Sequence, residues 1–397
     1  MENILTKVLP QEGGLEGSRS SVYNGVIGLL GLFTLVGIAF GVHAMFAGHE
    51  HVYGVTREVP WGLMLGAYVF FVVTSTGLCL VSSIGHVFGF EAFKPIAKRS
   101  VYLAIATIVA GFLVIAFEIE NPWRMAIYNI ISPNLSSNIW WMGTLYGAYL
   151  FFMLIEFALL QAGRHKIAGM CGLLGVISGV AAHSNLGAVF GLLNGREFWH
   201  GPYMPIYFIT SAMMSGCATV IFFHWLGYKI NGWKMSEQLQ ESLRSVAKLG
   251  ALLYLIIMFF TTWKLISGIS GHPPGKYEAI MALINGPFAK NFWYGEVALG
   301  LVIPFLIILA VRAKNLTAMA LGSLASIIGI FVMRYDLVIV GQIIPGFHQF
   351  NIVDLPHILP YAPTLHEWMV TLSGFTFCGI LFMMGERLFR GHLSEEH

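Results

Sequence analysis

Three polar side chains interrupt an apolar stretch of the sequence: His183, Ser184 and Asn185. Apolar residues flank them at 167–174 and 188–193, and a run of that length suits a helix that crosses a bilayer. Polar groups in hydrocarbon cost free energy unless they face protein, water or a ligand. A single residue of this kind most often bonds a neighbouring helix, but here other spans bring polar groups to the same depth. We therefore expect this layer to bind a ligand and to exchange protons with it.

The composition is that of a membrane protein. Hydrophobic residues make up 56% of the 397 residues and charged residues 11%, and the mean hydropathy is +0.73. A net charge of +2 is too small to indicate nucleic acid as a partner. The four cysteines are far apart and no CxxC or CxxCH motif occurs, so we expect neither an iron–sulfur cluster nor covalent haem in this chain.

Runs of about 20 apolar residues mark the elements that position the polar layer. They predict an all-α polytopic membrane protein, a single integral membrane domain of ten transmembrane helices. The predicted spans are 23–46, 62–88, 100–118, 140–161, 167–193, 204–227, 246–267, 292–312, 316–341 and 366–389.

Lysine and arginine orient these spans. With the N-terminus inside, 15 of the 22 basic residues fall in inside segments and five in outside loops, while Lys264 and Arg334 lie in or at the edge of spans. This asymmetry predicts that both termini are cytoplasmic and that the protein lies in the inner (cytoplasmic) membrane. Residues 1–22 form a polar cytoplasmic tail without the features of a cleavable signal peptide. The outside loops are long and contain apolar residues, which suggests a docking face for another protein or a cap that packs on itself.

A faint internal repeat suggests how the spans are grouped. Residues 74–79 of span two resemble residues 211–217 of span six, each with small residues around a glycine and a cysteine. We expect two four-helix bundles, spans two to five (62–193) and six to nine (204–341), with spans one and ten (366–389) flanking them. The small residues are expected to mark close helix packing rather than a site.

The topology gives each polar residue within the spans a depth. Most of them fall in the outer half of the membrane, where five spans contribute ionisable side chains. These are His43, Glu118, His183, Glu296, Arg334 and Asp336, accompanied by Asn185 and Tyr335. Arg334 is expected to pair with Glu118 or Glu296 on another span. The inner half offers mainly Glu156 and His86.

A one-sided cluster of this kind suits an apolar ligand with a polar head, such as a quinone. Its carbonyl oxygens accept hydrogen bonds from His or Tyr, and carboxylates take or supply protons. We expect His183, Asn185, His43, Arg334 and Tyr335 to bind quinone and Glu118, Asp336, Glu296 and Glu156 to transfer protons. A haem b anchor is an alternative, with His43 and His183 as the one pair of outer ligands.

At this point the sequence resembles a known family, the NrfD-type membrane subunits of polysulfide reductase and related complexes. Its ten-span group, which includes HybB and DsrP, is the most similar. The resemblance covers essentially the whole chain and rests on four short motifs: Pro60-Trp61-Gly62, Asn121-Pro122-Trp123-Arg124, His183-Ser184-Asn185-Leu186-Gly187 and Trp293-Tyr294-Gly295-Glu296.

The resemblance implies a subunit of a respiratory complex without a redox centre of its own. Such a subunit exchanges electrons between menaquinone and a ferredoxin-like iron–sulfur partner, often on the outer face, with protons moving to or from the quinone. By position, His183 matches the family's histidine in span five, Glu118 an acidic position, and His43 a first-span histidine near the quinone. A secondary transporter is the remaining alternative, and helices interrupted near mid-membrane would be its signature.

Overall fold

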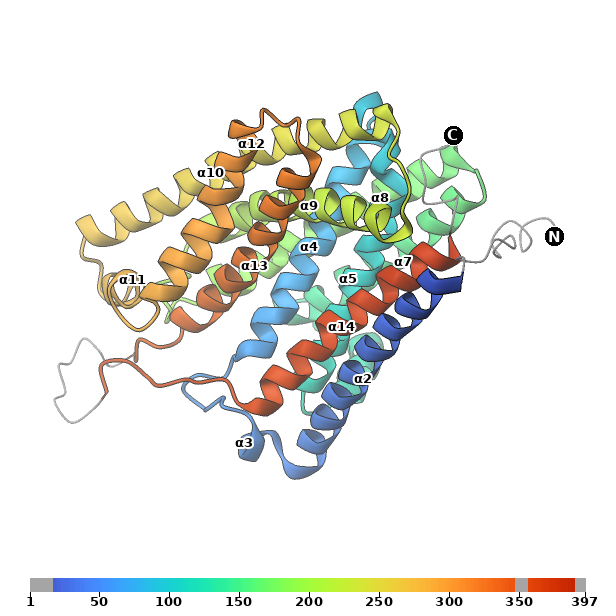
Figure 1. Cartoon of the computed structure of the whole chain (residues 1–397). Coiled ribbons are helices and arrows are strands. Elements are labelled where there is room, and N and C mark those ends of the chain that lie inside the picture. The colour runs from blue at the N-terminus through green and yellow to red at the C-terminus, as the bar shows by residue number, and fades with distance from the viewer. Residues whose placement is uncertain (1–16, 347–355, 390–397) are drawn as a thin grey trace.

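The computed structural model describes residues 17–346 and 356–389, and within these ranges every regular element is a helix (Figure 1). Ten helical segments are long and apolar enough to cross a membrane, as predicted. The protein is therefore an all-α, multi-pass membrane protein. The spans are α2 (Gly17–Ala47), α4 (Leu63–His86), η1–α5 (Glu91–Ile96 and Ala97–Glu118), α7 (Asn138–Gln161), α8 (His165–Gly191), α9 (Tyr203–Asn231), α10 (Glu237–Ser270), η2–α12 (Asn291–Val302 and Ile303–Ala310), α13 (Leu316–Val340) and α14 (Leu365–Leu388).

The span sequences form helices because a chain in hydrocarbon must satisfy its backbone hydrogen bonds internally. Polar side chains close several of the exposed ends. Ser137, Ser236 and Asn315 accept backbone N–H groups at the starts of α7, α10 and α13. Thr364 and Glu367 cap the start of α14 reciprocally. The starts of these four helices are thus encoded locally, by one cap residue in α7, α10 and α13 and by two in α14.

The connections divide between two faces of the molecule. At one, which we call the loop-rich face, the connections contain three short helices, α3 (His49–Val52), α6 (Pro122–Ile131) and α11 (Lys276–Ile284). At the other, the short-loop face, the turns after α7, α9 and α12 are brief. Both Gly17 and Leu388, the outer bounds of α2 and α14, lie at the short-loop face (Figure 1). The predicted tail lies largely outside the described residues.

The helices pack in two groups that meet along α4 and α9. In the first group α4 packs on α5 and α8, and α7 on α8; in the second, α9 packs on α10 and α13, and α13 on η2. Where α4 crosses α9, Gly77 faces Gly216, and a Cβ on either would overlap the backbone of the other helix. The two segments of the faint sequence repeat are therefore in direct contact.

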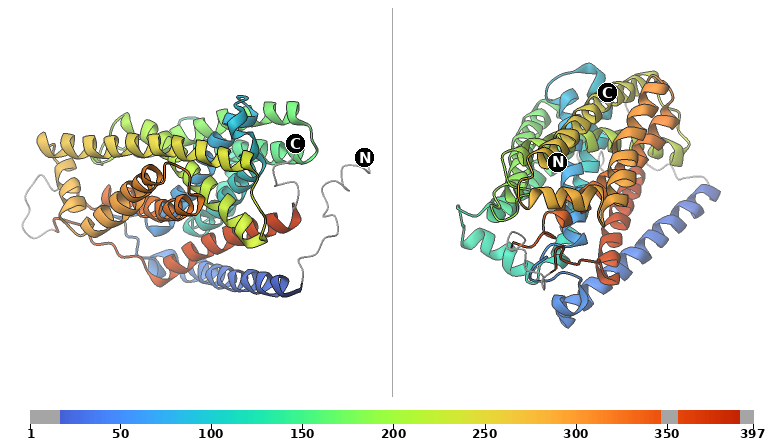
Figure 2. Two further views of the ribbon diagram at one scale, coloured as in Figure 1. Left: turned by 45° about the horizontal axis from the view of Figure 1, so that its top comes forward. Right: turned by 90° about the vertical axis from the view of Figure 1, so that its left-hand side faces the viewer.

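The remaining two spans, α2 and α14, lie side by side on the outside of α5 (Figure 2). Thr34 and Thr376 share a hydrogen bond of 2.8 Å across this pair, and Arg387 donates to Asn24 at 2.9 Å. Only 17% of the α2 span is buried, whereas 89% of the α4 span is. The α2 span thus presents mostly outward-facing surface, α14 is half buried, and α4 is the central helix.

Candidate functional site

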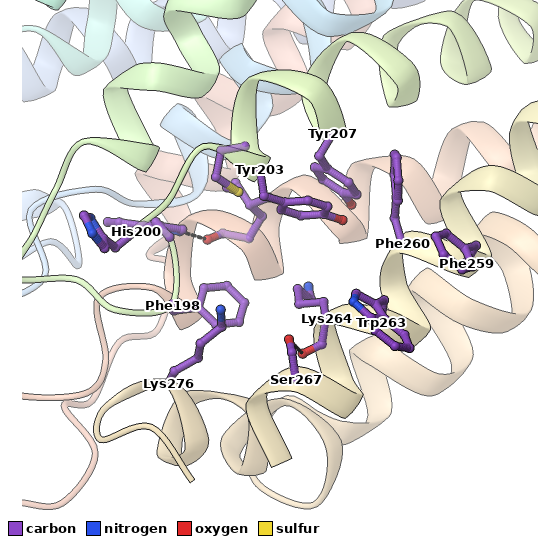
Figure 3. Close-up of a pocket in the computed structure, with 13 residues that line it drawn as sticks. Phe198, His200, Tyr203, Tyr207, Phe259, Phe260, Trp263, Lys264, Ser267 and Lys276 are labelled. Carbon is purple, nitrogen blue, oxygen red and sulfur yellow. Dashed lines mark hydrogen bonds between the residues drawn. The ribbon is translucent and has the colours of Figure 1, made fainter. Parts of the chain in front are cut away.

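A cavity of about 340 Å³ lies at the loop-rich face between the start of α9 and the end of α10, and we call it the chamber (Figure 3). The loop before α9, the end of α13 and the start of α11 complete its walls. It is lined by Phe198, Trp199, His200, Tyr203, Met204, Tyr207, Phe259, Phe260, Trp263, Lys264, Ser267, Lys276 and Leu337. An apolar cavity of this size with a few polar groups suits a small amphipathic ligand.

Aromatic contacts shape the chamber. Tyr203 and Tyr207 stack one helical turn apart at 5.5 Å, and Phe260 meets the Tyr203 ring edge-on at 5.5 Å. Phe259 and Trp263 stack on the outer side of α10, where 61% and 60% of their surfaces are exposed. Because that side of a membrane helix faces lipid, the chamber has its apolar rim toward the hydrocarbon.

One anchored tryptophan holds the loop that roofs the chamber. The indole N–H of Trp199 donates to the Leu337 carbonyl at 2.7 Å, at the end of α13. Gly341 lies against the same ring, and a Cβ there would overlap it. The loop before α9 can therefore fold onto α13 only because residue 341 has no side chain.

Four polar groups turn into the chamber in Figure 3: the hydroxyls of Tyr203 and Tyr207 and the ammonium groups of Lys264 and Lys276. The Tyr203 hydroxyl is buried without a hydrogen-bond partner among the described residues. Lys264 Nζ lies 5.1 Å from the centre of the Phe198 ring. Partial burial, with the nearby charge of Lys264, lowers the pKa of Lys276. The chamber is thus locally positive.

A small recess that contains two carboxyl groups lies beside the chamber and shares Phe198, Tyr207, Lys264 and Leu337 with it. Glu296 and Asp336 line it together with Tyr207, Met333 and Lys264. Asn291 donates to one oxygen of Asp336 at 3.1 Å. The other Asp336 oxygen and one Glu296 oxygen are buried and have no partner within the described residues. These groups can accept or supply protons beside the chamber.

Glu296 is positioned by an unusual helix. The segment η2 is a π-helix twelve residues long, a form that is rare and often found at functional sites. It ends before Pro304, which has no N–H to bond the Gly300 carbonyl, and the Ser326 hydroxyl donates to that carbonyl instead at 3.1 Å. Gly300 and Gly329 allow η2 and α13 to touch along their backbones.

Arg334 and His183 both lie beside the Phe208 ring. The guanidinium carbon is 5.1 Å from that ring and the imidazole 5.8 Å. Arg334 donates to the Ser211 hydroxyl at 2.5 Å, and Nδ1 of His183 shares a hydrogen bond of 3.1 Å with Tyr146. Both side chains are fully buried. The expected pairing of Arg334 with Glu118 or Glu296 does not form among the described ion pairs.

The other candidates at the loop-rich face lie apart from this group. His43 is exposed at the end of α2 and bonds His366 at 3.1 Å. Asn185 donates to the Asn138 carbonyl at 2.7 Å, and Tyr335 packs between the rings of Phe288 and Tyr361. The proposed haem pair, His43 with His183, is not brought together, because α2 packs on α14 while α8 packs on α7 and α9.

Two carboxylates complete the predicted set. Glu118, at the end of α5, has one buried oxygen without a partner within the described residues and does not line the chamber. Glu156 lies toward the short-loop face, where it hydrogen-bonds His86. Nearby, Arg99 makes two bonds of 2.7 and 3.0 Å to Glu386, a buried ion pair that sequence reasoning did not identify.

Sequence reasoning also missed the aromatic walls of the chamber. Tyr203 and Tyr207 are four residues apart at the start of a span, which places both on one helix face. Phe259, Phe260 and Trp263 stand at the matching depth of the next span. This pairing of aromatic clusters on consecutive spans was the available signal, although aromatic residues at membrane interfaces are common for other reasons.

Comparison with known proteins identifies relatives of the whole helical core. The family model for "Polysulphide reductase, NrfD" matches residues 51–346. The Hdr-like menaquinol oxidoreductase integral membrane subunit of Archaeoglobus fulgidus is 25% identical over 367 residues, which cover 88% of this chain and 90% of the relative. A selenate reductase subunit of Mesobacillus selenatarsenatis is 26% identical over 361 residues, covering 79% and 82%. Protein NrfD of Escherichia coli is 20% identical over 316 residues, covering 72% and 96%. The matched region contains the chamber, the recess and all eight helices of the two groups, and the chain belongs to the NrfD family of membrane proteins.

Proposed function

We propose that this protein is the quinone-interacting membrane subunit of a respiratory oxidoreductase complex and that the chamber holds the quinone headgroup. The observation that carries the proposal is an aromatic cavity with an exposed aromatic rim, beside which Glu296 and Asp336 each have one buried oxygen without a protein partner among the described residues. Relatives named as menaquinol oxidoreductase and selenate reductase subunits support the same class of complex. Menaquinone is the quinone we propose.

The residues fit such a headgroup. The Tyr203 hydroxyl and the Lys264 ammonium can donate to quinone oxygens, and the aromatic rings can flank the ring system. Glu296 and Asp336, in the recess, can take or supply the protons that accompany quinone chemistry. A bound quinone supplies the two-electron redox chemistry that these side chains do not have.

The proposed electron partner is a ferredoxin-like iron–sulfur subunit docked on the loop-rich face. The chamber opens close to that face, and α6 offers it exposed apolar side chains, including Trp123 and Ile130 at 76% and 81% exposure. We further propose that this face is extracytoplasmic and that the protein lies in the cytoplasmic membrane with both termini inside. The basic residues concentrated at the short-loop face support this orientation.

The chamber is tested with purified protein in detergent, by an optical spectrum, organic extraction and titration with a soluble menaquinone analogue. We expect co-extracted quinone, no haem band, and quenching of the fluorescence of Trp263 and Trp199 on titration. Phe260→Ala should weaken analogue binding about tenfold, since it removes one aromatic wall. Phe151→Ala, on the lipid side of α7, is the matched control. Quenching unaffected by Phe260→Ala would place the ligand elsewhere, and a strong haem band would overturn the proposal.

Proton translocation is the last part of the proposal. Buried polar groups continue from the recess toward the short-loop face: His183 with Tyr146, Tyr149 with Ser75 at 3.0 Å, and Glu156 with His86. We propose that these groups carry protons between the chamber and the short-loop face. Ionisable chains within membrane helices are a recurring means of proton relay.

His183, which lies beside Phe208 and bonds Tyr146, is the first residue of this proposed series. We expect His183→Ala to lower quinone-linked electron transfer by about a hundredfold and to abolish proton uptake from the short-loop side, with assembly intact. Proteoliposomes that enclose a pH-sensitive dye measure both quantities on the same sample. Proton uptake at the wild-type ratio to electrons would contradict the relay, whereas loss of the assembled complex would assign His183 a packing role.

A further inference from the structure

The charges around the chamber do not balance. Two cations, Lys264 and Lys276, line the chamber, Arg334 is buried near Glu296, and two carboxyl groups, Glu296 and Asp336, line the recess. Lys264 lines both the chamber and the recess, and it and Arg334 lie within electrostatic range of Glu296. With both carboxyl groups ionised the group carries one excess positive charge, and with both protonated it carries three. The excess is positive in every protonation state of the two acids.

None of these five groups belongs to an ion pair among the described residues. Arg334 donates to the neutral Ser211 hydroxyl, and two of its nitrogens have no partner there. Lys264 is held over the Phe198 ring rather than against a carboxylate. The chain can compensate a buried cation fully where it needs to, since Arg99 makes two hydrogen bonds to Glu386. The cations at the chamber therefore differ from Arg99 in that none of them is paired with a carboxylate among the described residues.

An uncompensated cation in a site of low polarity favours a negatively charged occupant. The shape of the chamber restricts what that occupant can be. Its rim of Phe259 and Trp263 faces lipid, so the ligand enters from the hydrocarbon, and its walls are aromatic faces. A planar, lipid-soluble headgroup with an ionised oxygen can both neutralise the excess positive charge and stack against the aromatic walls. An anionic phospholipid satisfies the charge alone.

We propose that the chamber prefers the deprotonated, anionic form of the reduced menaquinone headgroup over the neutral quinone, and that Lys264 is the residue that determines this preference. The inference rests on the proposed quinone function and deepens it, because it names the ionisation state that is bound. Lys264 is central because it alone among the three cations reaches both the chamber and the recess. Its ammonium is thus placed to contact a headgroup oxygen in the chamber (Figure 3), and its side chain also lines the recess together with Glu296 and Asp336.

The experiment uses two ligands that differ in charge and not in shape. The intact protein in nanodiscs of phosphatidylcholine is titrated with a 2-hydroxy-3-alkyl-1,4-naphthoquinone, which is an anion at neutral pH, and with the 2-methyl compound bearing the same chain. Lys264→Met is expected to weaken binding of the anion about tenfold and binding of the neutral compound less than about twofold. Lys264→Arg should retain the preference. Lys290→Met, which removes an exposed lysine at the same face, is the matched control and should change neither affinity.

The outcomes separate this inference from the proposed function. If Lys264→Met weakens both ligands equally, or neither, the preference for an anion is wrong while quinone binding stands. If the wild-type protein binds neither ligand, the proposed function itself fails. A final titration adds phosphatidylglycerol to the nanodiscs. Loss of anion binding in wild-type protein, with neutral-quinone binding unaffected, would show that the cations serve a lipid phosphate and would overturn the inference.

Discussion

Glu296→Gln is expected to reduce quinone-linked electron transfer by about a hundredfold while leaving the amount of folded protein unchanged. Glutamine keeps the shape of the side chain but cannot take up or release a proton at the end of the recess. General acid–base groups typically contribute about 10²–10⁴-fold to a rate. The measurement is the turnover of a quinol analogue by the assembled complex, with folded protein quantified by size-exclusion chromatography.

Two further variants make this result specific. Asp336→Asn changes the neighbouring carboxyl group. If the two acids act as a unit, the double variant should have a turnover only slightly below that of the slower single variant. Glu278→Gln lies outside the recess, at the start of α11, and should leave turnover within about twofold of wild type. Full activity in the Glu296→Gln protein would remove this carboxyl group from the chemistry.

The second large effect is structural. We expect Gly216→Val to prevent accumulation of folded protein, because its side chain would overlap the backbone of Gly77 where α4 crosses α9. Overpacking typically costs about 1–3 kcal/mol, and a clash with a helix backbone lies at or above the upper end because backbone cannot change rotamer. Thermal unfolding in detergent, followed by the loss of the monodisperse chromatographic peak, measures the effect.

Gly147→Val is the matched control for this prediction. Gly147 lies within the α7 span, and a Cβ there would meet no atom within 4 Å. The two variants make the same chemical change in a helix interior, so the difference between them isolates the crossing. Equal stability of the two proteins would mean that α4 and α9 do not approach as closely as the structure describes.

The ten spans could be predicted from the sequence because a bilayer imposes its requirement on each segment separately. A run such as 100–118 is apolar whatever its neighbours are, and the capped starts of α7 and α10 are encoded by Ser137 and Ser236. The π-helix could not be predicted in this way. It depends on Pro304, on the Ser326 hydroxyl of another helix and on the Gly300–Gly329 contact, which join residues far apart in the chain.

The sequence placed several polar residues in one layer of the membrane, but it did not predict the residues that line the chamber. Depth along a span placed His183, Glu296, Arg334 and Asp336 in one layer, and the structure places them around Phe208 and the recess. The depth of a residue along a span does not tell which way its side chain points around the helix axis, nor which helices are neighbours. For that reason the sequence grouped His43 with residues at a similar depth on other helices. In the structure α2, which carries His43, packs on α14 and α5 and so lies away from those residues.

The pairing of α2 with α14 has a consequence for how the protein is made. The α2 span acquires its main helical partner only after the eight spans between them have been synthesised, because α2 packs chiefly on α14. During translation α2 must therefore remain in the lipid as a lone anchor, and its low burial, 17%, suits it to that role. Insertion of α14 then gives α2 its helical partner. A nascent chain halted before residue 365 would expose the same strip of α2 and of α5 to the membrane, which offers quality-control proteases a way to distinguish unfinished copies from complete ones.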